Sequence, residues 1–314
     1  MFDRRDLLKS IAAYGSVSML GLTRMVSASD TRVVGALPSS EGTGTRLADI
    51  PVTEENTVTI ERRDQVVLIG INRPKSHNRI DPETYDALGK AYYGFENDPS
   101  LRAAVLFGHG DHFSRGIDVD AYELAAKNKK TILSDTGTID PLGKRKPFLT
   151  KPLVVVTHGN TWNMAHEFHL VADVRITAEN TEFGQDENTH GRFPGGGSTV
   201  RFVSEVGWGN AMRYMLTGEH WGALEAYRMG EIQAIAATRE DALKLGVDIA
   251  TKIAACAPLG IRATLASAHL AIDPQRQPVF DQLTAQYRSL YQTEDFREGR
   301  SAEAEHRAPV YKGK

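Results

Sequence analysis

The chain has 314 residues, of which 41% are hydrophobic and 25% are charged, the composition of an ordinary globular protein with room for a sizeable core. Its 37 basic and 40 acidic residues give a formal net charge of −3, and no Lys/Arg block stands out, so no nucleic acid partner is expected. The single cysteine, Cys256, excludes an intrachain disulfide framework. It lies in the apolar stretch AACAP, so we expect a buried, inert thiol.

The first 28 residues contain the features of an export signal in the usual order. Paired arginines in DRRDLLK precede the apolar run SIAAYGSVSMLGL, and VSA supplies small residues for cleavage. This segment resembles a twin-arginine signal, which implies a periplasmic protein; the alternative is a cytoplasmic protein with an N-terminal extension. The run is shorter than the roughly 20 residues of a spanning helix, so no stable membrane anchor is expected. Residues 29–56, rich in Thr, Ser and Gly, are expected to form a flexible lead-in.

The globular part is expected to open with a β-hairpin near residue 57. The β-branched runs TVTIERR and VVLIGINR are separated by a two-residue polar turn. Asp81 followed by Pro82 is a helix N-cap signal, and apolar residues recur after it at helical spacing. Short apolar runs that end in glycine predict strands within 103–108 and 152–159.

Helices dominate the second half of the chain. A helix from about Met164 to Ala172 and a strand in DVRITA come first. From Thr199 onward, helices are predicted in VRFVSEVG, NAMRYMLTG, REDALKLGVDIATKIAAC, LGIRATLASAHLAI and VFDQLTAQYRSLY. The cluster KNKK at 127–130 and the segment up to Gly143 predict a surface loop. The pattern therefore predicts one α/β core with a helical C-terminal extension.

Two predicted strand ends carry glycine-bearing turns that place backbone N–H groups where a ligand oxygen can be held. They are HGDHFSRGIDVD and HGNTWNMAHEF. A carbonyl that develops negative charge needs such preorganised donors. A helix that begins near Met164 adds the attraction of its positive end. The same turns also occur in any ordinary strand–glycine–helix connection.

Six motifs between Val58 and Arg307 follow one another in the order of a known family. They are INRPKSHNRI, FSRGIDV, GNTWNMAHEFHLVADVRI, FGQDENTHGRFPGGGST, YMLTG and REGRSAEAEHR. On these motifs the chain resembles the crotonase, or enoyl-CoA hydratase/isomerase, superfamily. The resemblance implies an α/β fold with a crotonase-like repeated ββα spiral core over 57–255 and a helical C-terminal oligomerisation region over 256–314. It also implies a homotrimer or a homohexamer.

The resemblance also assigns a catalytic site. It implies that the backbone N–H groups of Ile117 and Met164 form an oxyanion hole for an acyl oxygen, and that Glu167 and Glu187 are a general acid/base pair. Two carboxyl groups close together do not both ionise cheaply, so one can act as acid and the other as base. Without the resemblance, Glu167 would be a helix N-terminal acid and Glu187 a solvated loop residue.

Further residues are implied around this pair. The substrate pocket is expected to include Arg115, Gly116, Trp162, His166, Phe193 and Gly195, and the side facing coenzyme A to include Lys75 and Asn78. The triplet NMA at 163–165 replaces three glycines found in most of the family, which crowds the approach of a bulky thioester. Arg115 either pairs with an acid or contacts an anionic substrate. Glu303 and His306 replace an aromatic residue and a lysine that the family often carries near the CoA nucleotide.

No metal or resident cofactor is expected; coenzyme A enters only as part of a thioester substrate. His166, His169 and His190 lie near the glutamates in sequence, but no H-E-x-x-H pattern is present, so histidines of the core or of the site's surroundings are the favoured interpretation. The segment FPGGGST lacks the lysine of a phosphate-cradling loop.

Three functions are compatible with these residues. The leading hypothesis is an enoyl-CoA hydratase/isomerase-like lyase or isomerase, of the kind used in fatty acid metabolism, that holds an enolate at Ile117 and Met164. The first alternative is a hydrolase that cleaves a carbon–carbon bond of a non-thioester β-diketone. The second alternative is a non-catalytic binding protein on the same fold. Export and CoA chemistry conflict, because acyl-CoA is expected to be a cytoplasmic metabolite.

Overall fold

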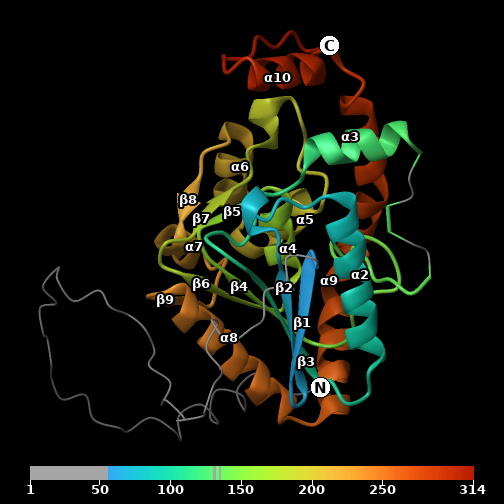
Figure 1. The fold of residues 1–314 in the computed structure, drawn as a ribbon, viewed down its shortest axis with the longest axis vertical. Coiled ribbons are helices and arrows are strands. Elements are labelled where there is room, and N and C mark those ends of the chain that lie inside the picture. The colour runs from blue at the N-terminus through green and yellow to red at the C-terminus, as the bar shows by residue number, and fades with distance from the viewer. Residues whose placement is uncertain (1–55, 130–131, 134–135) are drawn as a thin grey trace, which may run out of the picture. The chain divides into compact units, whose positions relative to one another are not determined.

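The computed structural model describes residues 56–129, 132–133 and 136–314, so the predicted export signal and almost all of the lead-in lie outside the described residues (Figure 1). A six-stranded sheet runs through the molecule in the order β1-β2-β3-β4-β6-β9. Its strands are β1 (Val58–Arg63), β2 (Val66–Ile71), β3 (Ala103–Gly108), β4 (Leu153–Thr157), β6 (Val174–Ala178) and β9 (Ala234–Ala236). Strand β1 pairs antiparallel with β2, and the other pairs are parallel. The predicted hairpin and strands are confirmed.

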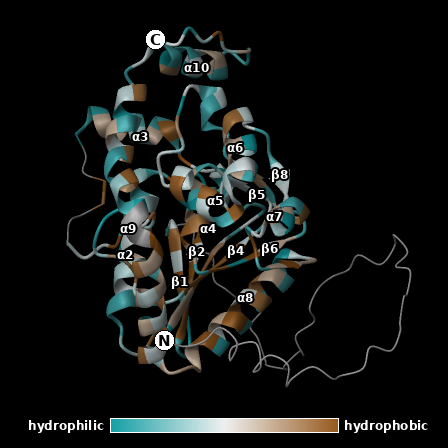
Figure 2. Ribbon diagram, turned by 180° about the vertical axis from the view of Figure 1, so that it is seen from behind, coloured by the Kyte–Doolittle hydropathy of each residue, from teal (hydrophilic) through white to brown (hydrophobic). Residues whose placement is uncertain are grey.

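Alternate residues of the buried strands face two different hydrophobic layers. Val67 and Ile69 of β2 pack in one cluster with α2 (Pro82–Asn97) and α4 (Met164–Val171), and Val66 and Leu68 pack in another with α8 (Arg239–Ala254). This period of two is what a strand buried on both faces shows. Helices α2 and α8 accordingly lie on opposite sides of the sheet in Figure 1, and Figure 2 colours the strands between them as hydrophobic.

Helix α2 begins where its sequence signals predict. The Asp81 side chain accepts a hydrogen bond from the Thr84 N–H at 2.8 Å, and Pro82 occupies the first turn. The apolar face of the helix buries Leu88 and Tyr92 against the sheet.

A second, three-stranded sheet supports the site. Its order is β5 (Asn160–Trp162), β7 (Glu182–Gly184) and β8 (Trp221–Gly222). Buried residues Phe183, Phe202 and Trp221 pack there with α5 (Ser198–Val206), α6 (Trp208–Thr217) and α7 (Ala223–Met229). These short strands and α7 are absent from the sequence-based prediction, because segments of two to seven residues carry too little periodicity.

The C-terminal region is helical, as predicted, but two predicted helices are one. Helix α9 (Pro258–Leu290) runs through Pro278, and α10 (Glu294–Ala304) follows after the N-cap Thr293. Phe280 and Leu283, just after the proline, pack on Val200 of α5, and this tertiary contact outweighs the local preference to break. Figure 1 shows α9 running beside α2 and α10 lying at the opposite end of the molecule from α8.

Two local predictions are wrong. Cys256 is exposed rather than buried, because α8 ends at Ala254 and the thiol lies in the connection to α9. The segment that ends at Gly143 is not a surface loop throughout, because Leu133, Ile139 and Leu142 are buried in the cluster under α2. Helix α3 (Val119–Lys127) ends inside the lysine cluster that begins this segment.

Among the described residues, no single helix is both long enough and apolar enough to cross a membrane. One bent pair, residues 239–254 with 258–272, passes that test only when its two parts, which meet at 105°, are joined.

Candidate active site

The candidate site is built where β3 and β4 end. Both strands finish at the same edge of the parallel sheet. The loop after β3 is bridged to the segment after β4 through Ser114 and Thr161, and to the segment before α2 through Ile117 and Ile80. Gly116 has a φ of +82°, and a Cβ there would lie 2.7 Å from the Trp162 carbonyl oxygen. Only glycine permits this contact between the two loops.

This contact brings the two amides named from the sequence onto adjacent segments. The position of a Cβ at Gly116 would be 3.4 Å from the Met164 nitrogen, and Ile117 is the next residue along the chain. The Ile80 N–H donates to the Gly116 carbonyl at 2.8 Å and fixes the first segment. Met164 is the first residue of α4, where an N–H has no partner within the helix. Within the described part of the chain, neither amide has a recorded acceptor, so both N–H groups are available to a ligand oxygen.

Glu167 lies one turn into α4 and is 3% exposed. Its Oε1 accepts hydrogen bonds from the Gly196 N–H at 2.7 Å and from the Ser198 N–H at 3.3 Å. Burial raises the pKa of this carboxyl, and the Lys144 charge and the two N–H donors partly offset the rise. A Cβ at Gly196 would lie 1.9 Å from Glu167 Oε2, so glycine is required for this approach. The glycine run of the segment FPGGGST therefore faces the buried Glu167 carboxyl.

Glu187 is also buried, at the start of the short helix η3 (Glu187–His190). The Gln185 Nε2 donates to its Oε1 at 3.0 Å and to its Oε2 at 3.1 Å. Burial raises the pKa of Glu187 well above its ordinary value, and the nearby Glu167 charge raises it further. Glu167 has two backbone donors that favour its ionised form, whereas the Glu167 charge raises the pKa of Glu187, so the surroundings favour the proton on Glu187.

The C-terminal helices of the same chain cover this pair. A Cβ at Gly195 would lie 2.7 Å from the Tyr287 ring, and the Tyr287 and Tyr291 hydroxyls are hydrogen-bonded to each other. Charge interactions of both tyrosines with Glu187 contribute to their raised pKa values, after burial. Phe193 packs beside them against the Phe280 cluster. Sequence reasoning missed the tyrosines, because nothing in the pattern of a long helix says which turn meets the site.

Arg115 and Trp162 contact each other, and Trp162 also contacts His220, a residue that the sequence did not single out. The Arg115 guanidinium lies 5.1 Å from the centre of the Trp162 ring, and the His220 ring lies 4.9 Å from it. The Arg115 Nε donates to the Asn160 side chain at 2.8 Å, so this nitrogen is paired with an amide oxygen. Hydrogen bonding to Asp186 raises the pKa of His220, despite partial burial.

Two predicted site residues lie elsewhere. His166 is fully buried, with its ring edge-on to that of Phe202 at 4.9 Å, because its position on α4 faces the second sheet. Asn78 is fully buried as well, and its Nδ2 donates to the carbonyls of His109 and His112 at 2.7 and 2.8 Å, so it braces a loop. Lys75 is exposed in the short helix η2 (Pro74–Ser76).

The remaining positions named from the sequence are accounted for as follows. His190 Nε2 lies 3.7 Å from Asp186 Oδ2, and Glu303 lies 3.2 Å from Arg300. Within the described ranges, no group of three His, Cys, Asp or Glu side chains is arranged to hold a metal ion.

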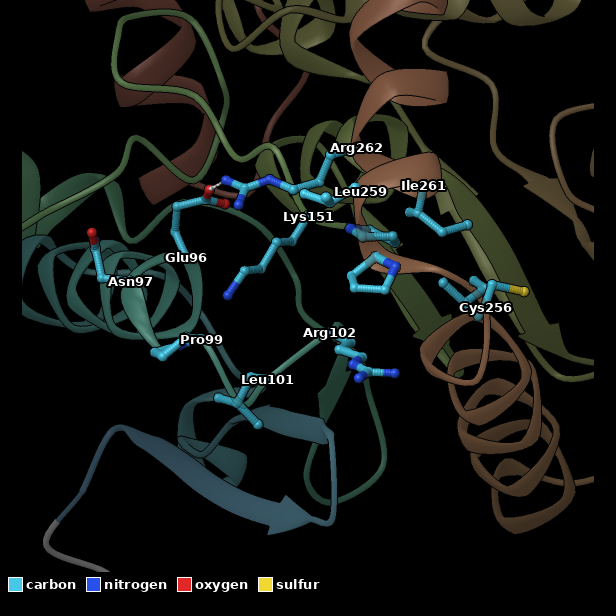
Figure 3. Close-up of a pocket in the computed structure, with 13 residues that line it drawn as sticks. Glu96, Asn97, Pro99, Leu101, Arg102, Lys151, Cys256, Leu259, Ile261 and Arg262 are labelled. Carbon is cyan, nitrogen blue, oxygen red and sulfur yellow. Dashed lines mark hydrogen bonds and ion pairs between the residues drawn. The ribbon is translucent and has the colours of Figure 1, made fainter.

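Two hollows lie away from the glutamates. A cavity of about 450 Å³ at the α8–α9 connection is bordered by Cys256, Leu259 and Lys151 and is crossed by an ion pair between Arg262 and Glu96 at 2.7 Å (Figure 3). A second cavity of about 420 Å³ lies under α9, with lining residues that include Phe148, Leu265, Ile272 and Phe280. Neither cavity is lined by Ile117, Met164, Glu167 or Glu187.

Two backbone N–H groups on adjacent segments at the ends of parallel strands, together with a buried carboxyl pair on α4 and η3, are the groups that the resemblance to the crotonases implies. The chain belongs to the enoyl-CoA hydratase/isomerase family, whose model matches residues 61–314. The predicted crotonase-like fold is confirmed, and the protein is an enzyme of this superfamily.

Individual relatives show how close the similarity is. The chain is 30% identical over 257 residues to the enoyl-CoA hydratase EchA19 of Mycobacterium tuberculosis, covering 81% of this chain and 96% of that protein. It is 29% identical over 259 residues to the 2,3-dehydroadipyl-CoA hydratase of Escherichia coli, covering 81% and 98%. The crystal structure of a carnitinyl-CoA hydratase from Mycobacterium avium is similar with a TM-score of 0.74 and 28% identity, covering 82% and 99%.

Proposed function

We propose that the protein adds water across the α,β double bond of an enoyl-CoA thioester, or removes it in the reverse direction. The observation that carries this proposal is the pair of buried carboxyls with different surroundings, Glu167 held by two backbone N–H groups and Glu187 raised in pKa by burial and by Glu167. Hydration needs one group that accepts a proton from water and another that gives a proton to carbon.

In the proposed reaction, the thioester oxygen lies between the Ile117 and Met164 amides. Glu167 takes a proton from water as the water oxygen bonds to Cβ, and the negative charge moves onto the thioester oxygen, where the two amides stabilise it. Glu187 then gives its proton to Cα and the carbonyl re-forms. The tyrosines on α9 limit access of bulk water, which strengthens these interactions.

Names of several relatives support a thioester substrate, since they act as hydratases or dehydratases of acyl-CoA compounds. Lys75, exposed on η2, is proposed to lie toward the nucleotide of coenzyme A. The Asn78 side chain is proposed only to shape that loop, because its polar atoms already bond to the backbone around it.

The test is hydration of crotonyl-CoA by the purified full chain, with Glu167→Gln and Glu187→Gln as variants that keep the shape of the side chain. We expect each variant to lose about 10²- to 10⁴-fold in kcat, the usual contribution of a general acid or base. Circular dichroism and the Tm of each variant establish that it is folded. Wild-type rates in both variants would refute the assignment. Turnover of a β-diketone without turnover of any thioester would instead identify the hydrolase.

A further inference from the structure

A chain of buried polar side chains extends from Glu187 into the second sheet. Gln185 donates through Nε2 to both oxygens of Glu187, at 3.0 and 3.1 Å. Its Oε1 is hydrogen-bonded to His166 Nδ1, and His166 Nε2 lies 3.0 Å from Glu231 Oε1. All four residues are at least nine-tenths buried. The three-residue relay Gln185–His166–Glu231 is therefore the support behind one of the two reacting carboxyls.

The donors and acceptors of this chain fix where one proton lies. A glutamine amide has donors only on nitrogen and an acceptor only on oxygen. Since Gln185 Nε2 faces the Glu187 carboxyl, its oxygen faces His166 and needs a donor there. His166 therefore carries a proton on Nδ1. The Gln185 side-chain amide in turn cannot rotate by 180° without placing its own N–H donors against the His166 N–H donor.

The far end of the relay is anchored. Trp221 Nε1 donates to Glu231 Oε2 at 2.8 Å, and Arg175 Nε donates to the Glu231 main-chain oxygen at 2.6 Å. Phe202 and Trp221 surround the His166 ring edge-on, at centroid distances of 4.9 and 5.1 Å. Polar groups buried among aromatic rings destabilise a fold unless their hydrogen bonds are satisfied, so this arrangement holds each member in one orientation.

His169 lies beside the relay without joining it. Its Nε2 is 3.4 Å from Glu231 Oε1, but neither ring nitrogen makes a hydrogen bond to any described residue. Burial lowers its pKa well below the ordinary value, and the charges of Arg175 and His166 lower it further, so the ring is neutral. His169 has the same residue type, helix and full burial as His166, and therefore makes a matched control.

We propose that His166 and Glu231 are positioning residues that set the orientation of Gln185 and, through it, the reactivity of Glu187; this inference rests on the proposed function. When Glu187 gives its proton to the substrate carbon, its carboxylate is left with a negative charge in a buried site. The Gln185 N–H groups, held toward that carboxylate by His166, stabilise the charge. No proton passes along the relay, and Glu187 remains the only member that exchanges a proton with substrate.

The first experiment locates the proton without using activity. In protein labelled with ¹⁵N-histidine, the His166 signals are those missing from His166→Leu. We expect a proton on Nδ1 at neutral pH, and we expect its resonance to shift in Glu187→Gln, since the relay joins the two residues. The inference would be overturned if the His166 ring is protonated on Nε2 alone, or if the Nδ1 resonance has the same chemical shift in Glu187→Gln as in wild type.

The second experiment measures rates with crotonyl-CoA. We expect His166→Leu to lower kcat by about 10- to 100-fold, the effect of losing a hydrogen bond that supports a charged group, with KM nearly unchanged. His169→Leu should leave both constants near the wild-type values. Equal losses in the two variants would mean that His166 is only a core residue and would refute the proposal.

A pair of substitutions at Glu231 covers the case in which His166→Leu does not fold. In Glu231→Gln the amide nitrogen can donate to His166 Nε2, which keeps the proton on Nδ1, so we expect a kcat within a few-fold of wild type. Glu231→Leu should lose about as much as His166→Leu. If the wild type hydrates no thioester, the proposed function fails, while the NMR experiment still decides whether the relay exists.

Discussion

Asn163 and Asp186 hold each other through two reciprocal hydrogen bonds. The Asn163 Nδ2 donates to Asp186 Oδ1 at 2.7 Å, and the Asp186 N–H donates to Asn163 Oδ1 at 2.9 Å. Asn163 precedes Met164 and has φ +55° and ψ −117°, a conformation that side chains other than glycine rarely adopt. Asp186 precedes Glu187. The pair therefore holds the strained backbone of Asn163 and links the proposed oxyanion hole at Met164 to the loop of Glu187, the proposed proton donor.

Substitution of Asn163 separates backbone strain from side-chain bonding. Asn163→Ala loses both hydrogen bonds and keeps a Cβ at positive φ, so we expect a fall in unfolding free energy about 1 kcal/mol greater than that of Asn163→Gly. We expect kcat to fall by about tenfold or more in Asn163→Ala, because the Met164 amide is displaced, and by less in Asn163→Gly. Denaturant unfolding and crotonyl-CoA kinetics measure the two effects; a more active alanine variant would contradict this account.

Gly196 is predicted to tolerate no side chain. In Gly196→Ala the added methyl would lie 1.9 Å from Glu167 Oε2, which is too close for two unbonded atoms. The carboxyl group would therefore have to leave its two backbone donors. We expect kcat to drop by about 10²-fold or more, since the base is displaced. Gly209→Ala is the control, because a Cβ there meets nothing within 4 Å. Kinetics of the two variants, with Tm as a folding check, decide the matter; similar rates would count against the role of Gly196.

Glu187 gives the protein a defined pH dependence. The pKa of Glu187 in the folded protein is raised well above 4.5, the value for the unfolded chain. At any pH between these two pKa values the native protein binds a proton that the unfolded chain does not. Stability from this group is present at low pH and is lost as pH rises through the raised pKa, by about 1.4 kcal/mol for each tenfold difference in proton affinity. Glu187→Gln should therefore lose less stability than wild type as the pH rises from about 4.5 toward the raised pKa of Glu187. Unfolding free energies across that range test the sign.

Activity in the hydration direction should follow the same proton. Because the proposed mechanism requires the acid form of Glu187, we expect kcat to decline as pH rises through the raised pKa of that group. A rate that keeps rising with pH across this range would show that Glu187 acts ionised.

We infer that α9 mediates assembly into a trimer or hexamer. It exposes Leu259, Leu270 and Ile272, with 81%, 75% and 41% of their surfaces accessible. Light scattering should give a mass three or six times that of one chain, and Leu270→Glu should reduce it, since a charge at such a contact is desolvated. Leu224→Glu on α7, at an equally exposed leucine, is the control. A monomeric wild type would remove the inference.

The paired arginines at positions 4 and 5 make export testable. We expect fractionation to recover the protein in the periplasm, and replacement of both arginines by lysine to retain it inside the cell. Recovery of the wild type in the cytoplasm alone would remove the conflict with a CoA substrate.

Much of the fold could be predicted from the sequence. Val66–Ile71 and Leu153–Thr157 are short apolar runs, and Asp81 with Pro82 is a local cap signal, so each could be assigned without knowledge of its neighbours. The prediction of two separate helices around Pro278 was wrong, because packing of the neighbouring turns on α5 allows α9 to continue through the proline. Local propensity cannot report such a contact.

Some residues of the site could likewise be predicted from the sequence, and others could not. Gly116, Met164 and Glu167 could be named because the motifs carry them, and the structure brings their segments together. His166 was assigned to the pocket because sequence adjacency to Glu167 does not show which face of a helix a residue occupies. Glu231 lies 65 residues from His166 along the chain, so no local pattern could join the two.

Trp162 supplies the protein with an optical reporter of its own. The Arg115 guanidinium lies 5.1 Å from the centre of its ring, and the His220 ring lies 4.9 Å from it at a tilt of 46°. The raised pKa of His220 keeps the imidazole cationic further toward neutral pH. A cationic imidazole in contact with an excited indole quenches its emission, whereas Trp208 is exposed and Trp221 is buried. A molecule that binds beside Arg115 would disturb these contacts of Trp162. Trp162 fluorescence can therefore follow ligand binding in real time, even for compounds that never react.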